Sequence, residues 1–506
     1  MSCKRCLEYA RGSGIILPIF SLPSDGGIGT IGKEAYKFVD FLEKAGQKYW
    51  QILPLGHTGF GNSPYQCYSV IAGNPLFIDF ETLKNEGLLS EEMLDEALEM
   101  KKVSRISYDE VIEGKYSILR TIYENFPKAY EQEYENDIRK FLKDNEKWIF
   151  DYSVFMFCKE HFNGKPIWKW PEDVRTKKNE TIWGFYDNYR DKINFYIFIQ
   201  YLFFKQWKNL KDYANSKGIK IIGDMPIYPA SDSVEVWKHP ELFKVDPITL
   251  KPYLVAGVPP DDCSSTGQRW GNPVYDWEYQ EKTNYEWWIW KYQANLKIYD
   301  IIRLDHFRGY SAYWEIPENE TTAENGKWIE GPRMKLFNAL YEHENKPLNF
   351  IAEDLGTIDD NVRKLLKESG FPGMNVMVYG LHANEDNIYL PHNWNKNSAS
   401  YITTHDTGTL LEELENLSKE DRKFALEYVR CIYSYEDVVN NFIRTVYASN
   451  ANIVLLSFQD LLKLNQEGRI NLPGTIGDNW SWRTPKDSFN NNLAEKLNNT
   501  AKIYKR

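Results

Sequence analysis

Short apolar segments alternate with amphipathic helical segments along most of the chain, and this alternation constrains the fold more than any other feature. The first unit is a strand at 14–20, a helix at Lys33–Ala45 and a second strand at 48–53. A strand–helix–strand unit of this length predicts parallel strands. Further apolar segments indicate strands at 219–224, 300–304, 348–352, 374–379, 399–403 and 452–457. About eight strands in βα alternation predict an α/β fold, a (βα)8 TIM barrel rather than an open doubly wound sheet.

Two long excursions interrupt the alternation, after the second and third strands. Residues 81–216 carry charged amphipathic helices, for example Ser90–Lys101 and Asn136–Asp144, whereas residues 227–276 are rich in Pro, Gly and Asp. Neither excursion contains a sequence repeat or a low-complexity tract. We therefore predict one catalytic barrel over residues 1–506. Its insertions lie at about 56–216, largely helical, and at about 227–285, loop-rich.

The composition narrows the class of partner. The net charge is -11 and the aromatic content is 15%, including 17 Trp and 34 Tyr. An acidic chain lacks the basic face that nucleic acids and anionic membrane surfaces require, so we expect neither as a partner. Tyr and Trp combine a flat apolar face with a polar group, which suits stacking against sugar rings.

Cysteine use and hydropathy indicate the compartment. Six cysteines spread over 506 residues are not a disulfide framework and favour a reducing environment. Cys3 and Cys6 have metal or redox spacing, but no second pair completes a site. The apolar run at 15–17 is too short for a signal peptide, and 195–204 is too short to span a membrane. A cytoplasmic location is predicted.

One motif imitates a dinucleotide site. Gly27–Gly32 matches the pattern G-x-G-x-x-G before a helix. However, the turn after the first strand is too long, and no acidic residue ends the second strand, where Leu53–Leu55 stands instead. No cofactor is therefore expected.

Four acidic residues lie at or just past the carboxyl ends of predicted strands: Asp224, Asp305, Glu353 and Asp406. In a βα barrel those ends converge on one face, where active sites form. A single acid at a strand end is common, because loops favour aspartate. Four like charges on one rim repel one another, so their gathering indicates a function.

Arg303 and Asp305 point to the same side of one strand, because strand side chains alternate. A neighbouring arginine lowers the pKa of a carboxyl group by roughly 1–3 units. A buried structural ion pair and a metal site are the alternatives, but the histidines lack zinc spacing and no loop indicates calcium. Glycoside chemistry fits better, because it pairs an ionised nucleophile with a carboxylic acid of raised pKa. Arg303 would keep Asp305 ionised, and Glu353 would carry the proton.

These strand-end motifs resemble the four signature regions of the α-amylase clan. Further motifs narrow the resemblance to the 4-alpha-glucanotransferases, also called amylomaltases or disproportionating enzymes. These motifs are Ser63–Tyr65 with Ala72–Pro75, Ala256–Asp261, Gly267–Pro273, Asn471–Thr475 and Asn479–Arg483. The resemblance covers Ser13 to Arg483. It implies a barrel without the separate C-terminal β-domain of the amylase clan.

The resemblance also implies residue roles. Asp305 would be the nucleophile that forms a covalent glycosyl-enzyme, Glu353 the acid/base, and Asp406 a third carboxylate that binds sugar hydroxyls. The loop 256–272 would overhang the acceptor side and exclude water. The implied substrate-binding residues, which include two stacking aromatics, are Ser63, Tyr65, Asp224, Asp261, Gln268, Trp270, Arg303, His306, His405 and Asn471.

Some of these residues have a structural alternative. Tyr65 and Trp270 could instead be aromatics that pack a loop, and Asn471 could be a turn residue. His57, His161 and His343 are interpreted as ordinary surface or core histidines.

The sequence departs from the family pattern at three places. Thr407 stands where the family usually has Asn, Asp262-Cys263 where an aromatic is common, and His382 at about the place of an aspartate. These departures concern acceptor preference and the ratio of transfer to hydrolysis.

The sequence thus predicts a retaining 4-alpha-glucanotransferase that moves segments between malto-oligosaccharides and α-1,4-glucans by double displacement, without a cofactor. An α-1,4-glucan hydrolase with the same residues and a non-catalytic glucan-binding scaffold are the alternatives. Oligomeric state and product range stay open.

Overall fold

A computed structural model describes residues 7–99, 104–126, 128–261, 264–382, 384, 386–431 and 437–506. Cys3, Cys6 and the Asp262-Cys263 pair lie outside this part of the chain. None of the helices in the described part is long and apolar enough to cross a membrane.

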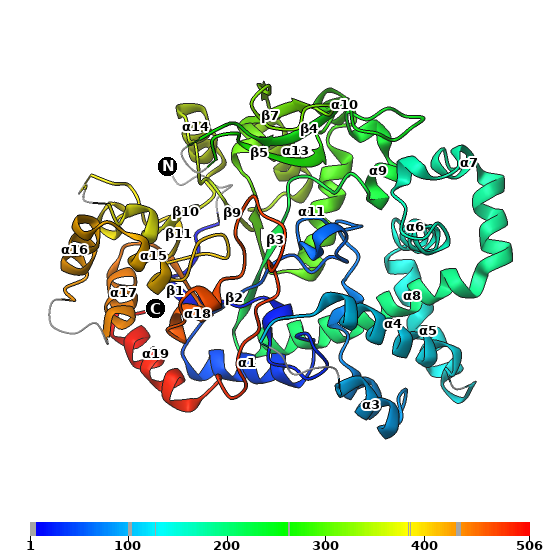
Figure 1. The fold of residues 1–506 in the computed structure, drawn as a ribbon, viewed down its shortest axis with the longest axis horizontal. Coiled ribbons are helices and arrows are strands. Elements are labelled where there is room, and N and C mark those ends of the chain that lie inside the picture. The colour runs from blue at the N-terminus through cyan, green and yellow to red at the C-terminus, as the bar shows by residue number, and fades with distance from the viewer. Residues whose placement is uncertain are drawn as a thin grey trace.

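The centre of the molecule is a barrel of eight parallel strands (Figure 1). The strands follow one another around the barrel in chain order, and the sheet order is β10-β11-β12-β1-β2-β3-β6-β9. Between its two end strands, the backbone N–H of Ala352 donates to Pro372 O (2.9 Å). The predicted (βα)8 barrel is confirmed. The strands are β1 Gly12–Ile16, β2 Tyr49–Gln51, β3 Lys220–Met225, β6 Ile301–Leu304, β9 Phe350–Ala352, β10 Gly373–Val376, β11 Ser398–Tyr401 and β12 Ile453–Ser457.

The observed strands are shorter than the apolar runs that predicted them, or shifted along them. The first run was predicted to continue to Phe20, but β1 ends at Ile16. Pro18 follows closely and has no backbone N–H to donate to a neighbouring strand. At its other end the strand begins earlier, at Gly12. A Cβ on Gly14 would lie 2.3 Å from Tyr49 O, so the small residue permits β1 and β2 to approach closely.

Helices surround the barrel and are bounded by recognisable caps. In α14 (Asp360–Ser369), the Asp359 side chain accepts from the backbone N–H groups of Asn361 and Val362, and Gly370 ends the helix with φ 72°. The remaining helices outside the first insertion are α1 Lys33–Lys44, α9 Val234–Lys238, α10 Trp277–Lys282, α11 Glu286–Ile298, α12 Arg308–Ser311, α13 Met334–Glu344, α15 Leu410–Asn416, α16 Lys419–Tyr428, α17 Val438–Ala448, α18 Phe458–Leu461 and α19 Asn491–Ile503.

The excursion between β2 and β3 is helical, and its larger helices gather on one side of the barrel (Figure 1). The long α8 packs against α6 and also reaches α1 and β3 of the barrel. This insertion contains α2 Phe80–Asn85, α3 Glu91–Leu98, α4 Tyr108–Glu124, α5 Lys128–Asp144, α6 Ile149–His161, α7 Glu172–Arg175 and α8 Asn179–Ser216.

The excursion after β3 contains more regular structure than its composition predicted. Strands β4 (Leu254–Val258) and β5 (Gln268–Pro273) join β7 (Ala312–Pro317) and β8 (Lys327–Glu330) in an antiparallel sheet of order β5-β4-β7-β8. The β4 run carries no clear alternation, and its partner β7 lies beyond β6 in sequence, so the pairing is not visible locally. After β12, the described residues 458–506 form helices and loops and no sheet strand.

Candidate active site

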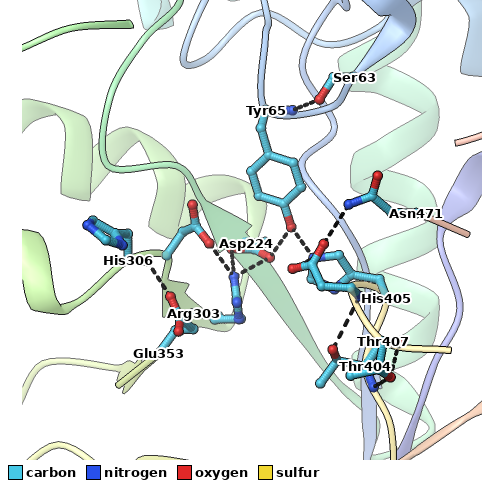
Figure 2. Close-up of polar contacts among 12 residues, drawn as sticks. Ser63, Tyr65, Asp224, Arg303, His306, Glu353, Thr404, His405, Thr407 and Asn471 are labelled. Carbon is cyan, nitrogen blue, oxygen red and sulfur yellow. Dashed lines mark hydrogen bonds and ion pairs between the residues drawn. The ribbon is translucent and has the colours of Figure 1, made fainter. Parts of the chain in front are cut away.

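The carboxyl ends of β3, β6 and β9 bring together three of the four predicted acids, and the turn after β11 adds the fourth (Figure 2). Asp224 is within β3, while Asp305 and Glu353 directly follow β6 and β9. Asp406 lies five residues after the end of β11 at Tyr401. Arg303 joins Asp224 to Asp305, and Tyr65 with His405 joins Asp224 to Asp406. Glu353 is instead bound by the backbone that follows Asp305 and by its own turn.

Arg303 links two of these acids across neighbouring strands. Its Nη1 donates to both oxygens of Asp224 (2.8 Å each) and to Asp305 Oδ1 (2.8 Å). The strand register places Asp224 beside Arg303. The Asp224 side chain is fully buried, whereas that of Asp305 is 25% exposed. Asp305 is therefore held by Arg303 through one oxygen and stays open to a ligand.

Glu353 is fixed by two backbone donors. The N–H of His306 donates to Oε2 (2.7 Å), and the N–H of Leu355 donates to Oε1 (3.0 Å). His306 adopts a left-handed conformation (φ 49°) in the turn after β6. Burial raises the pKa of Glu353 to about 8, with Arg303 opposing and the Asp305 charge adding to the shift. The carboxyl group is therefore protonated at neutral pH.

Asp406 has the opposite environment. Its Oδ1 accepts from Asn471 Nδ2 (2.7 Å), and its Oδ2 lies 3.1 Å from His405 Nε2. Burial works to raise the pKa of Asp406, but His405 and the Asn471 amide together hold it below its usual value. The backbone N–H of Asp406 donates to Thr404 Oγ1 (3.2 Å). Asp406 is thus ionised, whereas Glu353 is protonated.

Tyr65 reaches the same centre from the loop after β2 (Figure 2). Its hydroxyl donates to Asp224 Oδ2 (2.9 Å) and lies 2.7 Å from His405 Nε2, and its ring stacks on the His405 ring (centroids 5.7 Å apart). Ser63 Oγ accepts from the Tyr65 backbone N–H (3.2 Å). Ser63 thus shapes the turn that presents Tyr65.

Trp270, the aromatic residue predicted on the acceptor side, lies against the turn after β6 that carries His306. The Trp270 ring meets the His306 ring edge-on, with centroids 4.8 Å apart, and its Nε1 donates to Gln268 Oε1 (3.2 Å). Burial lowers the pKa of His306 to about 4, so this ring is neutral. Asp261 is exposed, and its Oδ1 accepts from Ser264 N (2.8 Å) within its own loop.

Two departures from the family pattern have clear structural surroundings. Thr407 Oγ1 accepts from Thr404 N (3.0 Å) and closes the turn that carries Asp406. His382 is exposed, and its Nδ1 lies 3.6 Å from Asp421 Oδ2 of α16. Thr407 therefore supports the site through its turn, and His382 contacts an outer helix.

Trp480 lies at the site, and no individual role was predicted for it from the sequence. Its ring lies 5.7 Å from that of Tyr65 and 6.2 Å from that of His405, and its φ is 62°. The available signal was its place in the Asn479–Arg483 motif. Within the described residues, no group of three or more His, Cys, Asp or Glu side chains could hold a metal ion.

A βα barrel whose strand ends bring a protonated Glu353, an ionised Asp406 and a carboxyl group bound to Arg303 to one centre has the architecture of enzymes that act on glycosidic bonds. Comparisons with known proteins narrow this class. A family model described as 4-alpha-glucanotransferase matches residues 17–488. The 4-alpha-glucanotransferase of Clostridium butyricum is 46% identical over 96% of this chain and 99% of that protein. That of Streptococcus pneumoniae is 41% identical over 98% and 97%.

A solved structure agrees with these relatives. The amylomaltase from Streptococcus agalactiae in complex with acarbose superposes with a TM-score of 0.94 at 41% identity, covering 98% of this chain and 99% of that one. The chain belongs to the 4-alpha-glucanotransferase family, and its reaction class is that of the family.

Proposed function

We propose that this enzyme transfers α-1,4-glucan segments with retention, by double displacement. In the first step Asp305 attacks the anomeric carbon, and the glycosidic bond breaks as Glu353 gives its proton to the departing oxygen. The products are a glycosyl ester on Asp305 and a shortened glucan with a free 4-hydroxyl. In the second step Glu353, now ionised, takes the proton of an acceptor 4-hydroxyl, which attacks the ester and releases Asp305.

The observation that carries this proposal is the pairing of two unlike carboxyl groups on adjacent strand ends. Asp305 is bound to a guanidinium, and Glu353 is protonated and fixed through the backbone of the residue next to Asp305. Environments that separate the protonation states of two carboxyl groups are how such enzymes assign nucleophile and acid.

The other predicted residues support this chemistry at two levels. We assign Asp406, Trp270, Gln268 and Asp261 to contacts with the sugars. Asp406 is ionised and would accept hydrogen bonds from sugar hydroxyls. The remaining predicted residues are assigned to positioning, because each holds a carboxyl group, Tyr65 or Arg303 in place: Ser63, Tyr65, Asp224, Arg303, His306, His405 and Asn471.

We propose malto-oligosaccharides and α-1,4-glucans as substrates. The support is the family membership, together with the acarbose complex of the Streptococcus agalactiae relative. The β5 strand holds Trp270 against His306, and we propose that this aromatic edge keeps water from the glycosyl ester. A glucan hydroxyl rather than water would then complete the reaction.

We further propose that residues 1–506 act as one catalytic domain in the cytoplasm. Cys67 and Cys158 are free thiols, which a reducing compartment favours.

Incubation of the purified protein with maltotriose, followed by separation of products by length, tests the proposal. We expect glucose together with a series of longer maltodextrins. Glucose and maltose alone would identify a hydrolase instead. An unchanged substrate peak, with maltodextrin binding retained, would identify a glucan-binding scaffold.

A further inference from the structure

The loop that carries Tyr65 is an irregular hairpin between β2 and the helical insertion. Isolated antiparallel bridges pair Gly56 with Gly73 and Thr58 with Cys67, so Tyr65 lies near its tip. We call residues 56–73 the Tyr65 hairpin. Backbone hydrogen bonds such as that from Gly59 N to Gln66 O (2.8 Å) join the two arms, and side chains from other elements attach the hairpin to the rest of the fold.

His57 connects this hairpin to two helices of the insertion. Its Nδ1 lies 2.8 Å from the hydroxyl of Tyr152 on α6, and its Nε2 lies 3.0 Å from the hydroxyl of Tyr116 on α4. Burial lowers the pKa of His57 to about 3, so the ring is neutral, with one donor and one acceptor nitrogen. Tyrosine hydroxyls both donate and accept, so both ring nitrogens have suitable partners.

The backbone of His57 also joins the two arms of the hairpin. Its N–H donates to Ala72 O (3.1 Å), and its carbonyl accepts from Tyr68 N (2.9 Å). A shift of this residue would therefore move both arms. Tyr65 lies three residues before Tyr68 on the same arm.

Two further side chains hold the base of the hairpin. Gln200 of α8 accepts from the N–H of Gly73 (2.8 Å) and donates to its carbonyl (2.7 Å). Glu235 of α9 accepts from Ser69 Oγ and Val70 N (3.0 Å each). A Cβ on Gly73 would lie 2.1 Å from the Phe203 ring, so the hairpin lies directly against α8.

We infer that the helical insertion braces the Tyr65 hairpin, and that His57 is the positioning residue through which α4 and α6 set the place of Tyr65. This inference rests on the proposed function, because it requires the Tyr65 hydroxyl to matter for turnover. The insertion thereby acts on the carboxylate centre through Tyr65, which contacts Asp224 and His405.

A double-mutant cycle on maltotriose disproportionation tests the inference. His57→Leu removes the contacts that His57 makes with the hydroxyls of Tyr116 and Tyr152, and so frees the hairpin. Tyr65→Phe removes the hydroxyl contacts with Asp224 and His405. We expect each single variant to lower kcat about tenfold, the scale of one lost hydrogen bond of about 1.4 kcal/mol, with a smaller change in KM. When Tyr65→Phe is already present, adding His57→Leu should lower kcat further by less than about twofold.

A matched variant separates positioning from general destabilisation. Arg120 lies on α4 four residues after Tyr116 and pairs with Glu160 of α6 (2.6 Å), without contact to the hairpin. Arg120→Met should lower the unfolding temperature and leave kcat unchanged. Tyr116→Phe removes one of the two His57 contacts from the helix side without touching Gln200, and should reproduce part of the kcat loss of His57→Leu.

The outcomes are distinguishable. Multiplicative losses in the double variant, or full activity of His57→Leu, would overturn the inference while leaving the proposed function intact. A kcat loss in Arg120→Met equal to that of His57→Leu would show that the insertion matters only for stability. Full activity of Tyr65→Phe would overturn both the inference and the assigned role of Tyr65.

Discussion

Glu353 carries a proton in one half of the proposed reaction and releases it in the other. The N–H groups of His306 and Leu355 hold its two oxygens in place, and they can do so in both protonation states. The charge of Asp305 helps to keep the proton on Glu353, and formation of the glycosyl ester removes that charge. The pKa of Glu353 should therefore fall once the ester has formed, which suits its second role as a base.

The pH dependence of turnover follows from this carboxyl group. Its pKa is raised to about 8, so the acid form is present at neutral pH and is lost above that value. We expect kcat/KM for maltotriose to fall about tenfold per pH unit above about pH 8. A pH–rate profile at constant ionic strength measures this, and a profile that stays level to about pH 10 would contradict the acid assignment.

The same shift has a consequence for stability. Because the folded-state pKa of Glu353 lies above its unfolded value, its contribution is complete at low pH and is lost as pH rises through about 8. Glu353→Gln does not titrate. Between about pH 5 and pH 8 the parent loses stability as pH rises and the variant does not. The free energy of unfolding of the variant, relative to that of the parent, should therefore rise by up to about 1.4 kcal/mol per pH unit. Urea unfolding at several pH values measures it, and a constant difference would contradict the raised pKa.

At the scale of single elements, the turns after the strands position the site. The turn after β11 carries Thr404, His405 and Asp406, and Thr407 closes it through its hydroxyl. The Thr407 side chain makes a turn contact of the kind that Asn, Ser and Thr all provide, so it suits the position where the family resemblance led us to expect Asn. We interpret this departure as a change of turn residue.

Thr407→Val tests this interpretation. The substitution keeps the shape of the side chain but leaves the buried N–H of Thr404 without its acceptor. We expect a loss of about 1–3 kcal/mol in the free energy of unfolding and a reduced kcat, because Asp406 shifts with the turn. Thr500→Val on α19, whose hydroxyl donates to Lys496 O, is the matched control and should change neither by much. Unchanged kcat in Thr407→Val would refute the turn role.

At the scale of the whole molecule, the barrel fold could be predicted from the sequence. Parallel strands end on one face, so the apolar runs and the acids that follow them predicted both the fold and the meeting of Asp224, Asp305, Glu353 and Asp406. The site residues in the two excursions, such as Tyr65 and Trp270, were predicted only from the resemblance to the family.

Contacts between segments far apart in the chain could not be predicted in this way. The β4–β7 pairing joins segments on either side of β6, and His57 meets residues 59 and 95 positions away. The sharing of Arg303 between Asp224 and Asp305 depends on the register of β3 against β6. None of these has a local sequence pattern, which is why His57 was interpreted as an ordinary histidine.

We propose that the antiparallel sheet, packed against the barrel, keeps water from the acceptor side of the site. Trp270→Ala removes the ring that packs on His306 and opens that side to water. We expect the share of hydrolysis among the maltotriose products to rise several-fold relative to transfer. Trp183→Ala, at an exposed position of the insertion (55% exposed), is the control and should leave the ratio unchanged. An unchanged ratio in Trp270→Ala would contradict the water-excluding role.

The central claim is that Asp305 becomes glycosylated during turnover. The direct measurement uses Glu353→Gln with α-maltosyl fluoride, a donor whose leaving group needs no acid, followed by rapid denaturation, proteolysis and mass spectrometry. We predict that a maltosyl adduct accumulates on the peptide containing Asp305, because the base that would activate the acceptor is missing. An adduct on Asp224 or Asp406, or turnover of the donor without any adduct, would contradict the account.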